Sequence, residues 1–262
     1  STILDIRNAT VSYQDGETTT TALADASLIA ESNTLTAIVG ESGSGKSTLL
    51  SVAAGLITPD SGSVHVDGTR SIIFQQANLL PWKSVRANVE LGPLLRGAPA
   101  QERREIGERQ LRLVGLETFA DRKPYELSGD MQQRAQIARV LANDPDVILM
   151  DEPFGAVDPL VRRDLQREMA RIQAELGKTI IFVTHDVDEA LALGDEIILL
   201  REGAQVAQRG SGPQLLAHPA DDFVARFLGL DDAARQLQLT DVAESRIVLD
   251  RAGRAVGRLA DE

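Results

Sequence analysis

Residues 40–47 of the chain read Gly40-Glu41-Ser42-Gly43-Ser44-Gly45-Lys46-Ser47 and fit the pattern G-x-x-x-x-G-K-[ST]. In this pattern the glycines let backbone N–H groups wrap phosphate oxygens, the lysine reaches the β- and γ-phosphates, and the final hydroxyl binds Mg²⁺. The apolar run Thr34–Val39 precedes the stretch, and Lys46–Leu56 reads as a helix whose N-terminus adds partial positive charge. A plain glycine-rich turn is the alternative, but a random chain of this size matches the pattern at roughly 1%.

We therefore predict a loop that binds nucleotide phosphates. The predicted nucleotide contacts are the residues of this loop and the residue after it: Gly40, Glu41, Ser42, Gly43, Ser44, Gly45, Lys46, Ser47 and Thr48. Ser47 is also a predicted Mg²⁺ ligand.

A pair of acidic residues follows an apolar strand later in the chain. Val147–Met150 is uniformly apolar, as a strand covered on both faces is, and Asp151 and Glu152 come directly after it. Carboxylates at the carboxyl end of a parallel strand lie where open α/β sheets bind ligands. We predict that Asp151 holds Mg²⁺ through water and that Glu152 polarises the attacking water. A solvated strand end is the alternative, and the loop at residues 40–47 favours the catalytic interpretation.

Short strands and turns make up the first third of the chain. The predicted strands are Ile3–Ala9, Leu23–Ala30, Thr34–Val39, Val64–Val66 and Ser71–Phe74. We predict a turn with a threonine-rich loop over Gln14–Thr21 and a turn at Asp67-Gly68 between the last two strands.

The middle of the chain, from Ser84 to Asn143, has a mostly helical pattern. Gln101–Val114 is one predicted helix, with Pro99 suited to its first turn, and Gly129–Ala142 is another, with Ser128 as its N-cap. Strand and helix then alternate, which predicts a mainly parallel sheet with helices on both faces. The predicted elements of this last part are the strands Val147–Met150, Thr179–Val183 and Glu196–Leu200 and the helices Leu165–Leu176 and Val187–Leu193.

The composition is that of a globular protein with an acidic balance. The sequence has 262 residues, with 27 Lys plus Arg against 39 Asp plus Glu, and a formal net charge of −12. This charge argues against binding nucleic acid by general phosphate attraction, although a few local groups can still hold one nucleotide. The chain has no cysteine, which excludes a disulfide scaffold, a thiolate zinc site and a cysteine nucleophile.

Neither a membrane span nor a signal peptide is expected. The longest uncharged runs, Ser47–Pro59 and Ser71–Trp82, are shorter than the ~18–20 apolar residues that a membrane helix needs. Residues 1–10 lack a basic region followed by an apolar core. We therefore expect a cytoplasmic protein that reaches a membrane only through a partner.

The phosphate-binding loop, the segment Leu127–Gln132 and Asp151-Glu152 occur in the order and spacing of the ATP-binding-cassette (ABC) ATPases, and the chain resembles this family over about residues 3–230. The resemblance implies ATP and Mg²⁺ as cofactors. It also implies an α/β P-loop NTPase fold with a mainly parallel core sheet, an antiparallel β subdomain and a helical subdomain inserted at about residues 84–143. The predicted domains are an ABC ATPase domain, residues 1–230, and a short C-terminal appendage, residues 231–262.

Further residues match accessory motifs of the family. Tyr13 falls where the family stacks an aromatic ring on adenine, and an ordinary surface aromatic is the alternative. Gln75 matches the glutamine that senses Mg²⁺ and the γ-phosphate; its register with Leu79-Leu80-Pro81-Trp82 selects it over Gln76. The resemblance thus adds Gln75 to the predicted metal ligands Ser47 and Asp151.

Two more matches concern the catalytic site and the partner subunit. His185 matches the histidine that contacts the γ-phosphate, so that Glu152, His185 and Gln75 are the predicted catalytic residues. A histidine that only caps a strand end is the alternative for His185. Asp158, in Ala156-Val157-Asp158, matches the loop that crosses to the partner subunit, the D-loop.

The signature segment departs from the family pattern Leu-Ser-Gly-Gly-Gln. Its predicted contacts with the partner's ATP are Ser128, Gly129 and Asp130, and the carboxylate of Asp130 stands where the family has a second glycine. If this carboxylate faces the phosphates, it weakens closure of the dimer by repulsion. If it turns outward, it stabilises the first turn of the helix Gly129–Ala142. We favour the outward orientation.

The resemblance also implies partners. Two copies of the chain pair head to tail around two ATP molecules, with each phosphate-binding loop facing the other copy's signature. The helical insertion grips transmembrane permease subunits, so the chain is expected at the cytoplasmic face of the inner or plasma membrane. An extracytoplasmic substrate-binding protein is an indirect partner, and no nucleic acid is expected. Trp82 is the candidate anchor on the permease, and a core tryptophan is the alternative.

Two similarities bear on the transported solute, and they point to different groups of importers. Leu79-Leu80-Pro81-Trp82 looks like the nitrate, sulfonate and taurine importers, whereas residues 203–229 look more like the glycine betaine, choline and proline importers. We favour the osmoprotectant importers because that similarity is longer. It rests on family analogy, since the solute never touches this subunit.

Two other functions are considered as alternatives to a transport ATPase, and a separate prediction concerns the tail. A permease-free ABC ATPase is one class, against which the single copy of each motif argues. An ATP-binding switch that hydrolyses poorly is the other; the intact Lys46 and Glu152 argue against it, and Asp130 favours it weakly. In the tail we predict a hairpin of Ser245–Asp250 and Ala255–Leu259 with a structural role.

Overall fold

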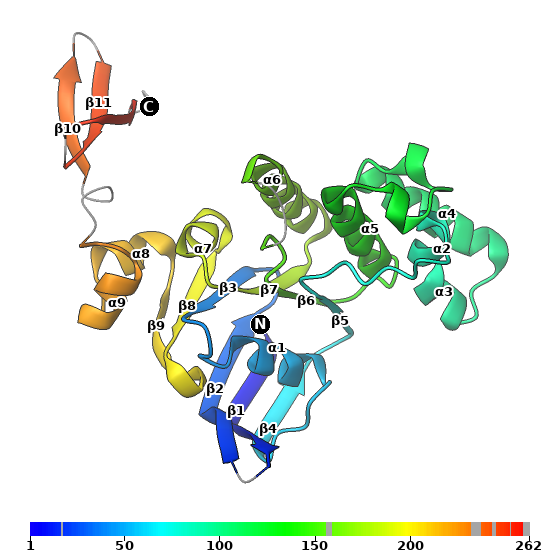
Figure 1. Ribbon diagram of the computed structural model, residues 1–262, viewed down its shortest axis with the longest axis horizontal. Helices are drawn as coiled ribbons and strands as arrows, with labels where there is room; N and C mark the ends of the chain where they lie inside the picture. The colour runs from blue at the N-terminus through cyan, green and yellow to red at the C-terminus, as the bar shows by residue number, and fades with distance from the viewer. Residues whose placement is uncertain (17, 156–158, 232–236, 243–244, 252, 259–262) are drawn as a thin grey trace.

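A six-stranded sheet of order β5-β6-β7-β3-β8-β9 forms the centre of the computed structural model, which describes residues 1–16, 18–155, 159–231, 237–242, 245–251 and 253–258 (Figure 1). The strands β5, β6, β7, β3 and β8 run parallel, and β9 runs antiparallel to β8. Their bounds are β3 Leu35–Gly40, β5 Arg70–Ile73, β6 Val147–Asp151, β7 Thr179–Thr184, β8 Glu196–Leu200 and β9 Val206–Gly210. The predicted mainly parallel sheet is therefore confirmed.

A second sheet of order β2-β1-β4 is antiparallel, which confirms the predicted antiparallel β subdomain and corrects one prediction within it. Its strands are β1 Thr2–Asp15, β2 Thr18–Glu31 and β4 Ser61–Val66. The predicted turn is present, but the threonine-rich loop around it is wrong: β1 and β2 continue through it, and Tyr13 pairs with Thr20. Threonine is β-branched and favours strands, so only the residues around Gly16, with φ of 61°, make the turn.

The two strands expected on either side of the turn Asp67-Gly68 belong to different sheets. β4 pairs with β1, whereas β5 pairs with β6. The turn at Gly68 therefore carries the chain from one sheet to the other instead of closing a hairpin. β5 begins the edge of the central sheet that leads toward the helical part of the chain (Figure 1).

Helix α1, Lys46–Ala54, lies between the two sheets (Figure 1). Its buried residues Leu49 and Leu50 share one hydrophobic core with Ile6 of β1 and with Ile38 of the central sheet. A second core on the other face of the central sheet contains Val39. Neighbouring residues of β3 thus serve opposite cores, as the period of two along a strand requires. This packing fixes the loop between β3 and α1.

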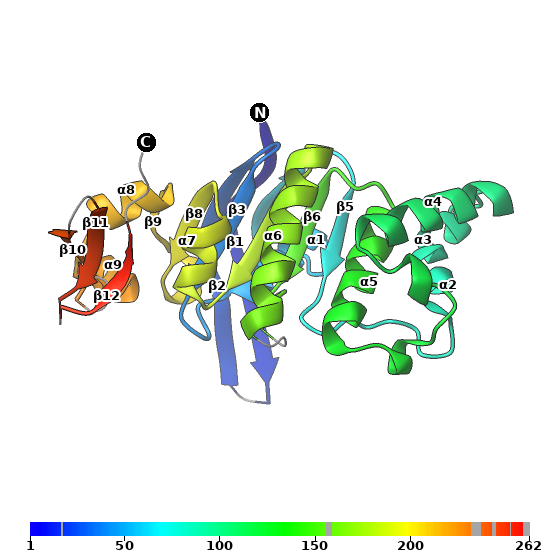
Figure 2. The same cartoon turned by 90° about the horizontal axis from the view of Figure 1, so that it is seen from above.

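The helices predicted between Ser84 and Asn143 are present and lie to one side of the central sheet (Figure 2). They are α2 Val85–Val89, α3 Leu91–Leu95, α4 Ala100–Leu113 and α5 Gly129–Leu141, with short 3-10 turns at Glu117–Phe119 and Pro124–Glu126. Pro99 is the N-cap of α4 and not part of its first turn, a small correction.

The α-helices that the structure describes after β6 are α6 Pro159–Leu176, α7 Val187–Leu193, α8 Gly212–Ala217 and α9 Asp222–Phe227, with a 3-10 turn at Glu202–Ala204. In α6 the predicted apolar face is buried at Leu165, Met169 and Ile172, while Leu176 is 42% exposed. The predicted helix Val187–Leu193 and strand Glu196–Leu200 are confirmed with the same bounds.

A small antiparallel sheet of order β10-β11-β12 ends the chain, at β10 Leu237–Val242, β11 Ser245–Asp250 and β12 Ala255–Arg258 (Figure 1). The predicted hairpin is confirmed as β11 and β12, and β10 is an additional strand. Among the helices of the described ranges, none is long and apolar enough to cross a bilayer.

Candidate functional site

The loop between β3 and α1 has the backbone that its glycines permit. Gly43 and Gly45 have φ values of 82° and 96°, which side-chain-bearing residues rarely adopt. A Cβ on Gly45 would lie 2.4 Å from the Ala22 carbonyl oxygen, so the position also has no room for a side chain. No side chain caps the N-terminus of α1, whose N–H groups are left for a ligand.

Lys46 is almost completely buried in this loop. Its Nζ donates to the carbonyl oxygens of Gly40 and Glu41, both at 2.8 Å. Burial lowers the pKa of Lys46, and the nearby Glu152 and Asp151 carboxylates oppose this shift. A buried cation beside unpaired N–H groups is the electrostatic environment that a phosphate group requires.

The hydroxyl of Ser44 adds to this cradle. It is buried, and its Oγ has no hydrogen-bond partner among the residues that the structure describes. An unpaired buried hydroxyl is costly unless a ligand supplies its partner.

Ser47 and Asp151 meet at the first turn of α1. The Ser47 Oγ donates to Asp151 Oδ1 at 3.0 Å. Burial raises the pKa of Asp151, and the Ser47 hydrogen bond opposes this shift. Mg²⁺ in nucleotide sites takes one or two protein oxygens and completes its shell with phosphates and water, so this pair fits the ion. Within the described ranges, no group of three or more His, Asp or Glu side chains offers another metal site.

Glu152 and His185 come together from neighbouring parallel strands. Glu152 directly follows β6, His185 directly follows β7, and the two strands pair side by side. His185 Nδ1 lies 3.1 Å from Glu152 Oε1. Glu152 has a φ of 43° and donates its backbone N–H to the Val183 carbonyl oxygen at 3.0 Å. A strained backbone held by a strand hydrogen bond is typical of a functional residue.

A cleft of about 370 Å³ lies over the phosphate-binding loop. Thr20, Thr21, Ala22 and Glu202 line it together with the loop and Glu152. Sequence reasoning missed these four residues. Thr20 and Thr21 fall in the segment misread as a loop, Ala22 directly follows it, and Glu202 follows β8, which only the sheet order places beside β3.

Tyr13 and Thr48 lie beside the cleft. The Tyr13 Oη is 3.4 Å from the Thr48 Oγ1, and Tyr13 is 46% exposed. The ring is thus next to the phosphate-binding loop and accessible to a ligand.

Gln75 lies on the other side of Glu152. A Cβ on Gly155 would be 3.1 Å from the Gln75 Nε2 and 3.6 Å from the Glu152 Oε2. Ser47 and Asp151 are hydrogen-bonded to each other, and the role of Gln75 as the third metal ligand stays a prediction. Asp158 lies outside the described residues.

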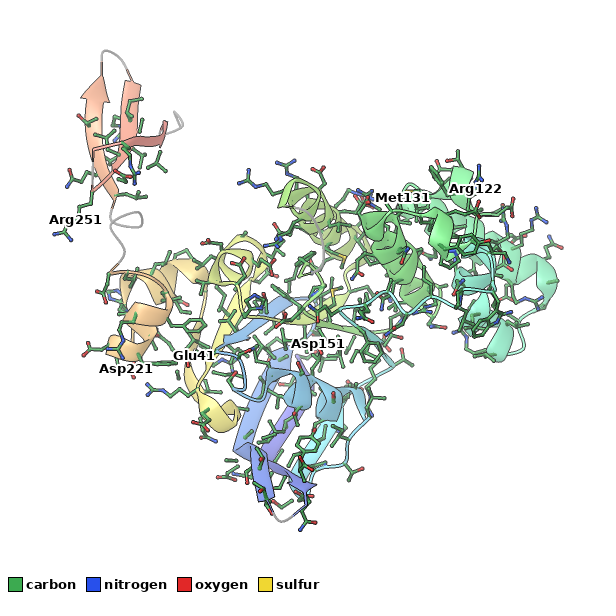
Figure 3. All side chains as sticks on the ribbon, in the orientation of Figure 1. Glu41, Arg122, Met131, Asp151, Asp221 and Arg251 are labelled. Carbon is green, nitrogen blue, oxygen red and sulfur yellow. The ribbon has the colours of Figure 1, made fainter. Side chains whose placement is uncertain are left out.

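The signature residues do not line the cleft of their own chain. Met131, the next residue after Asp130, lies on α5 at a distance from Asp151 (Figure 3). Ser128 takes the N-cap position of α5 but makes no capping bond, because its hydroxyl donates to Asp130 Oδ1. Asp130 lies in the first turn of α5 and its carboxylate accepts the hydrogen bond of the signature serine, while its orientation toward a partner's phosphates stays a prediction.

Comparison with known proteins places this geometry in context. Residues 23–155 match the family model described as "ABC transporter". The glycine betaine/carnitine transport ATP-binding protein GbuA of Listeria monocytogenes is 43% identical over 220 residues, covering 78% of this chain and 55% of that protein. The taurine import ATP-binding protein TauB of Roseobacter denitrificans is 46% identical, covering 68% of this chain and 70% of that protein.

The structural similarity agrees. A dimeric ATP-binding cassette in a post-hydrolysis state, bound to ADP and Pi, superposes with a TM-score of 0.72 at 35% identity, covering 80% of this chain and 98% of that one. The chain spans about half the length of the glycine betaine relatives, 55% and 52% of the first two.

Proposed function

The chain belongs to the ABC transporter ATP-binding family, and from this premise we propose that it is an ATP-hydrolysing motor subunit of an importer for a small solute. One observation carries the proposal: the Ser47–Asp151 pair, the buried Lys46 and the Glu152–His185 pair converge around one cleft. A site that only binds nucleotide has no need of a carboxylate paired with an imidazole beside the phosphates.

Each residue has a role that follows from its place. Lys46 and the N-terminus of α1 bind the β- and γ-phosphates, and Ser47 and Asp151 hold Mg²⁺, which neutralises the phosphate charge when bound. Glu152 accepts a proton from the attacking water, and its hydrogen bond to His185 orients its carboxylate. Tyr13 offers an exposed ring for the adenine.

The signature requires a second copy of the chain. Ser128 and Gly129 are exposed and belong to a different part of the surface from the cleft, so they are available to the phosphates bound by a partner. A closed C2 dimer of two identical chains gives each cleft one signature. The dimeric state of the solved cassette supports this arrangement.

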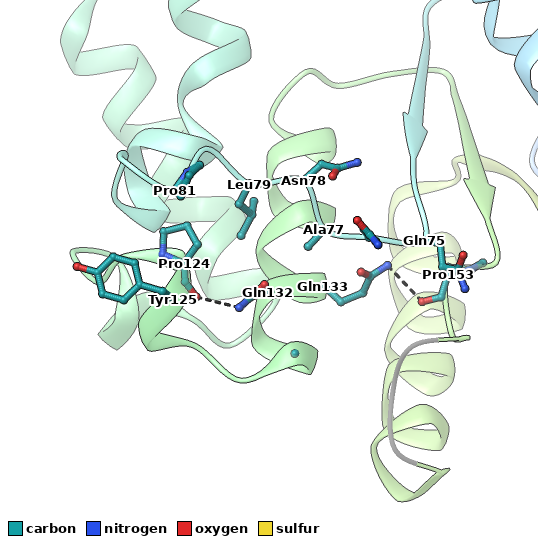
Figure 4. Close-up of a pocket in the computed structure, with 12 residues that line it drawn as sticks. Gln75, Ala77, Asn78, Leu79, Pro81, Pro124, Tyr125, Gln132, Gln133 and Pro153 are labelled. Atoms are coloured by element: carbon teal, nitrogen blue, oxygen red, sulfur yellow. Dashed lines mark hydrogen bonds between the residues drawn. The ribbon is translucent and has the colours of Figure 1, made fainter.

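The permease is proposed to bind the groove between the central sheet and the helical part. This groove has a volume of about 480 Å³ and is lined by residues 75–79 and Pro81, by Pro124 and Tyr125, and by residues of α5 (Figure 4). Tyr125 is 75% exposed, and Trp82, next to Pro81, is 69% exposed. The core alternative for Trp82 is wrong. Because Gln75 lines the same groove, a bound helix there would sense the catalytic side.

The proposed solute is an osmoprotectant such as glycine betaine, choline or proline. The glycine betaine/carnitine protein supports this choice, and the taurine import protein supports the second candidate, a sulfonate. Binding to a permease would place the chain at the cytoplasmic face of its membrane. Uptake of labelled betaine and of taurine by vesicles carrying the cognate permease and binding protein distinguishes the two solutes.

The ATPase itself is tested with two variants. Glu152→Gln should bind MgATP like the wild type and lose at least about a hundredfold in turnover, because general base catalysis contributes about 10²–10⁴-fold. It should also accumulate as an ATP-bound dimer in ultracentrifugation. Lys46→Ala should instead weaken ATP binding, since it removes the buried cation of the loop.

Two results would contradict the proposal. Wild-type turnover in Glu152→Gln would move the general base to another residue. Unchanged ATP affinity in Lys46→Ala would remove the phosphate-binding assignment.

A further inference from the structure

A buried polar network fixes the backbone on both sides of His185. Before it, the Thr184 Oγ1 donates to Glu189 Oε2 at 2.7 Å and accepts the Asp186 N–H at 3.0 Å. After it, Asp186 Oδ1 accepts the N–H groups of Asp188 and Glu189 at 2.8 and 3.3 Å, which begins α7. The His185 side chain is 62% exposed, so few neighbouring side chains restrain the ring. Its position therefore depends mainly on the backbone that carries it.

A single arginine from another helix closes this network. Arg162, on α6, places its Nη1 3.4 Å from Asp186 Oδ2 and 3.6 Å from Glu189 Oε1. The Glu189 side chain is only 6% exposed and that of Arg162 is 29% exposed. Burial raises the pKa of Glu189, and the Thr184 hydroxyl and Arg162 are among the groups that oppose the shift.

A carboxylate at this depth is costly unless a cation compensates it. Thr184 supplies one neutral hydrogen bond to Glu189, and Arg162 supplies a cation 3.6 Å from the Glu189 Oε1. Arg162 is in turn attached to α6, which packs against the signature helix α5.

We propose that Arg162 and Glu189 are a positioning pair for the reaction, which holds His185 against Glu152 and makes that geometry depend on the place of α6. The proposal rests on the ATPase function proposed above. Neither residue touches the nucleotide cleft, and both act through the loop that carries His185. Loss of the pair lets the loop relax, which lengthens the contact between His185 Nδ1 and Glu152 Oε1.

A pair that only stabilises the fold is the competing explanation. It predicts a lower melting temperature with unchanged kinetics in the folded protein. A positioning pair predicts a lower kcat at an unchanged KM for ATP, because the cleft proposed for the nucleotide is lined by residues of the loop 40–47 and not by His185.

The experiment compares Arg162→Met, Arg162→Lys and Glu189→Gln with a control on the same helix, Arg167→Ala. Arg167 is 78% exposed in its side chain and pairs only with Asp164 in the described part of the chain. Arg162→Met and Glu189→Gln should each lower kcat about tenfold, with KM within about twofold. Arg162→Lys should recover most of the loss in kcat. The double variant Arg162→Met/Glu189→Gln should lose no more kcat than either single variant, and the control Arg167→Ala should match the wild type.

A second measurement does not depend on turnover. The imidazole ¹⁵N resonances of His185 report its tautomer and its hydrogen bond to Glu152. They should change in Arg162→Met and Glu189→Gln and stay unchanged in Arg167→Ala. This readout also applies if Arg162→Met is unstable, because Arg162→Lys and Glu189→Gln keep a polar group at each site.

The outcomes separate the two proposals. A wild-type protein without ATPase activity contradicts the proposed function, while the ¹⁵N resonances still test the pair. An active wild type with unchanged kcat and unchanged His185 resonances in folded Glu189→Gln and Arg162→Met overturns the positioning role. A rise in KM at constant kcat overturns it as well.

Discussion

At the scale of single residues, Asp130 places a negative charge beside the serine that is proposed to meet a phosphate. Its carboxylate accepts the hydroxyl of Ser128, the residue proposed to meet the partner's γ-phosphate. If Ser128 meets the phosphates as proposed, a carboxylate that contacts this serine would lie within a few ångströms of them and would repel them. The acid is nevertheless favourable for the first turn of α5, because it interacts with the positive end of the helix dipole.

The prediction is that Asp130 restrains closure of the dimer. In the Glu152→Gln background, Asp130→Asn should strengthen MgATP-dependent dimerisation about tenfold, as removal of one repulsive charge would. Asp130→Gly should do the same and also lower Tm by about 1–3 °C, since it removes the acid from the helix N-terminus and adds backbone freedom. Ultracentrifugation with MgATP measures the first effect and thermal unfolding the second. Unchanged dimer affinity in both variants would show that the carboxylate leaves Ser128 on closure.

Residues whose chemistry depends on the local pattern could be predicted from the sequence. Lys46 and Asp151 belong to contiguous motifs at the carboxyl ends of β3 and β6, two parallel strands that both pair with β7. Arg162 and Glu189 could not be found in this way. Their contact depends on how α6 packs beside α7, and neither residue type has a local pattern that marks it as buried.

At the scale of elements, the exposed tryptophan at the start of the helical part distinguishes a role in the permease interface from a role in stability. Trp82 is 69% exposed and follows Pro81, which lines the groove proposed for the permease (Figure 4). A large exposed aromatic beside a groove is typical of an interface anchor. Because the ring buries little area in the free chain, its removal should cost little stability.

We predict that Trp82→Ala leaves the free subunit unchanged and uncouples transport. Tm should change by about 2 °C or less, and basal ATPase activity should stay within about threefold. Solute uptake by vesicles carrying the permease should fall about tenfold or more, as for a buried interface anchor. Leu95→Ala is the matched control, since Leu95 is 78% exposed and does not line the groove. Equal uptake losses in both variants, or a fall in Tm, would contradict the assignment.

Element type could be predicted more easily than strand pairing. The helix Val187–Leu193 is amphipathic and capped by Asp186, signals that lie within the segment itself. The separation of β4 and β5 into two sheets had no such signal, because a short turn at Gly68 is compatible with either a hairpin or a crossing. The two strands β1 and β2 were predicted too short, because the threonines beside the turn read as a loop.

At the scale of the whole molecule, the division between residues 1–230 and the tail is a prediction that the packing supports. In the described part of the chain, neither hydrophobic core includes a residue beyond Leu230. The small sheet β10–β12 exposes Leu237, Leu239 and Val256 by 55%, 60% and 59%, so its apolar side chains bury little area. A sheet of three short strands without a packed face is marginal by itself.

We predict that a chain ending at Leu230 folds and hydrolyses ATP like the whole chain. Removal of residues 231–262 takes no side chain from either hydrophobic core and none from the cleft over the phosphate-binding loop. Tm should therefore stay within about 2 °C, and kcat within about twofold.

Deletion of the same length at the other end, residues 1–32, is the contrasting control, because it removes β1 and β2 and with them Ile6 and Leu23 of the core around α1. That deletion should abolish cooperative unfolding, since α1 would lose the sheet that covers it. A loss of 5 °C or more from the C-terminal deletion, by the usual scale of about 2–4 °C per kcal/mol, would instead show that the tail packs on the body and that the boundary lies elsewhere.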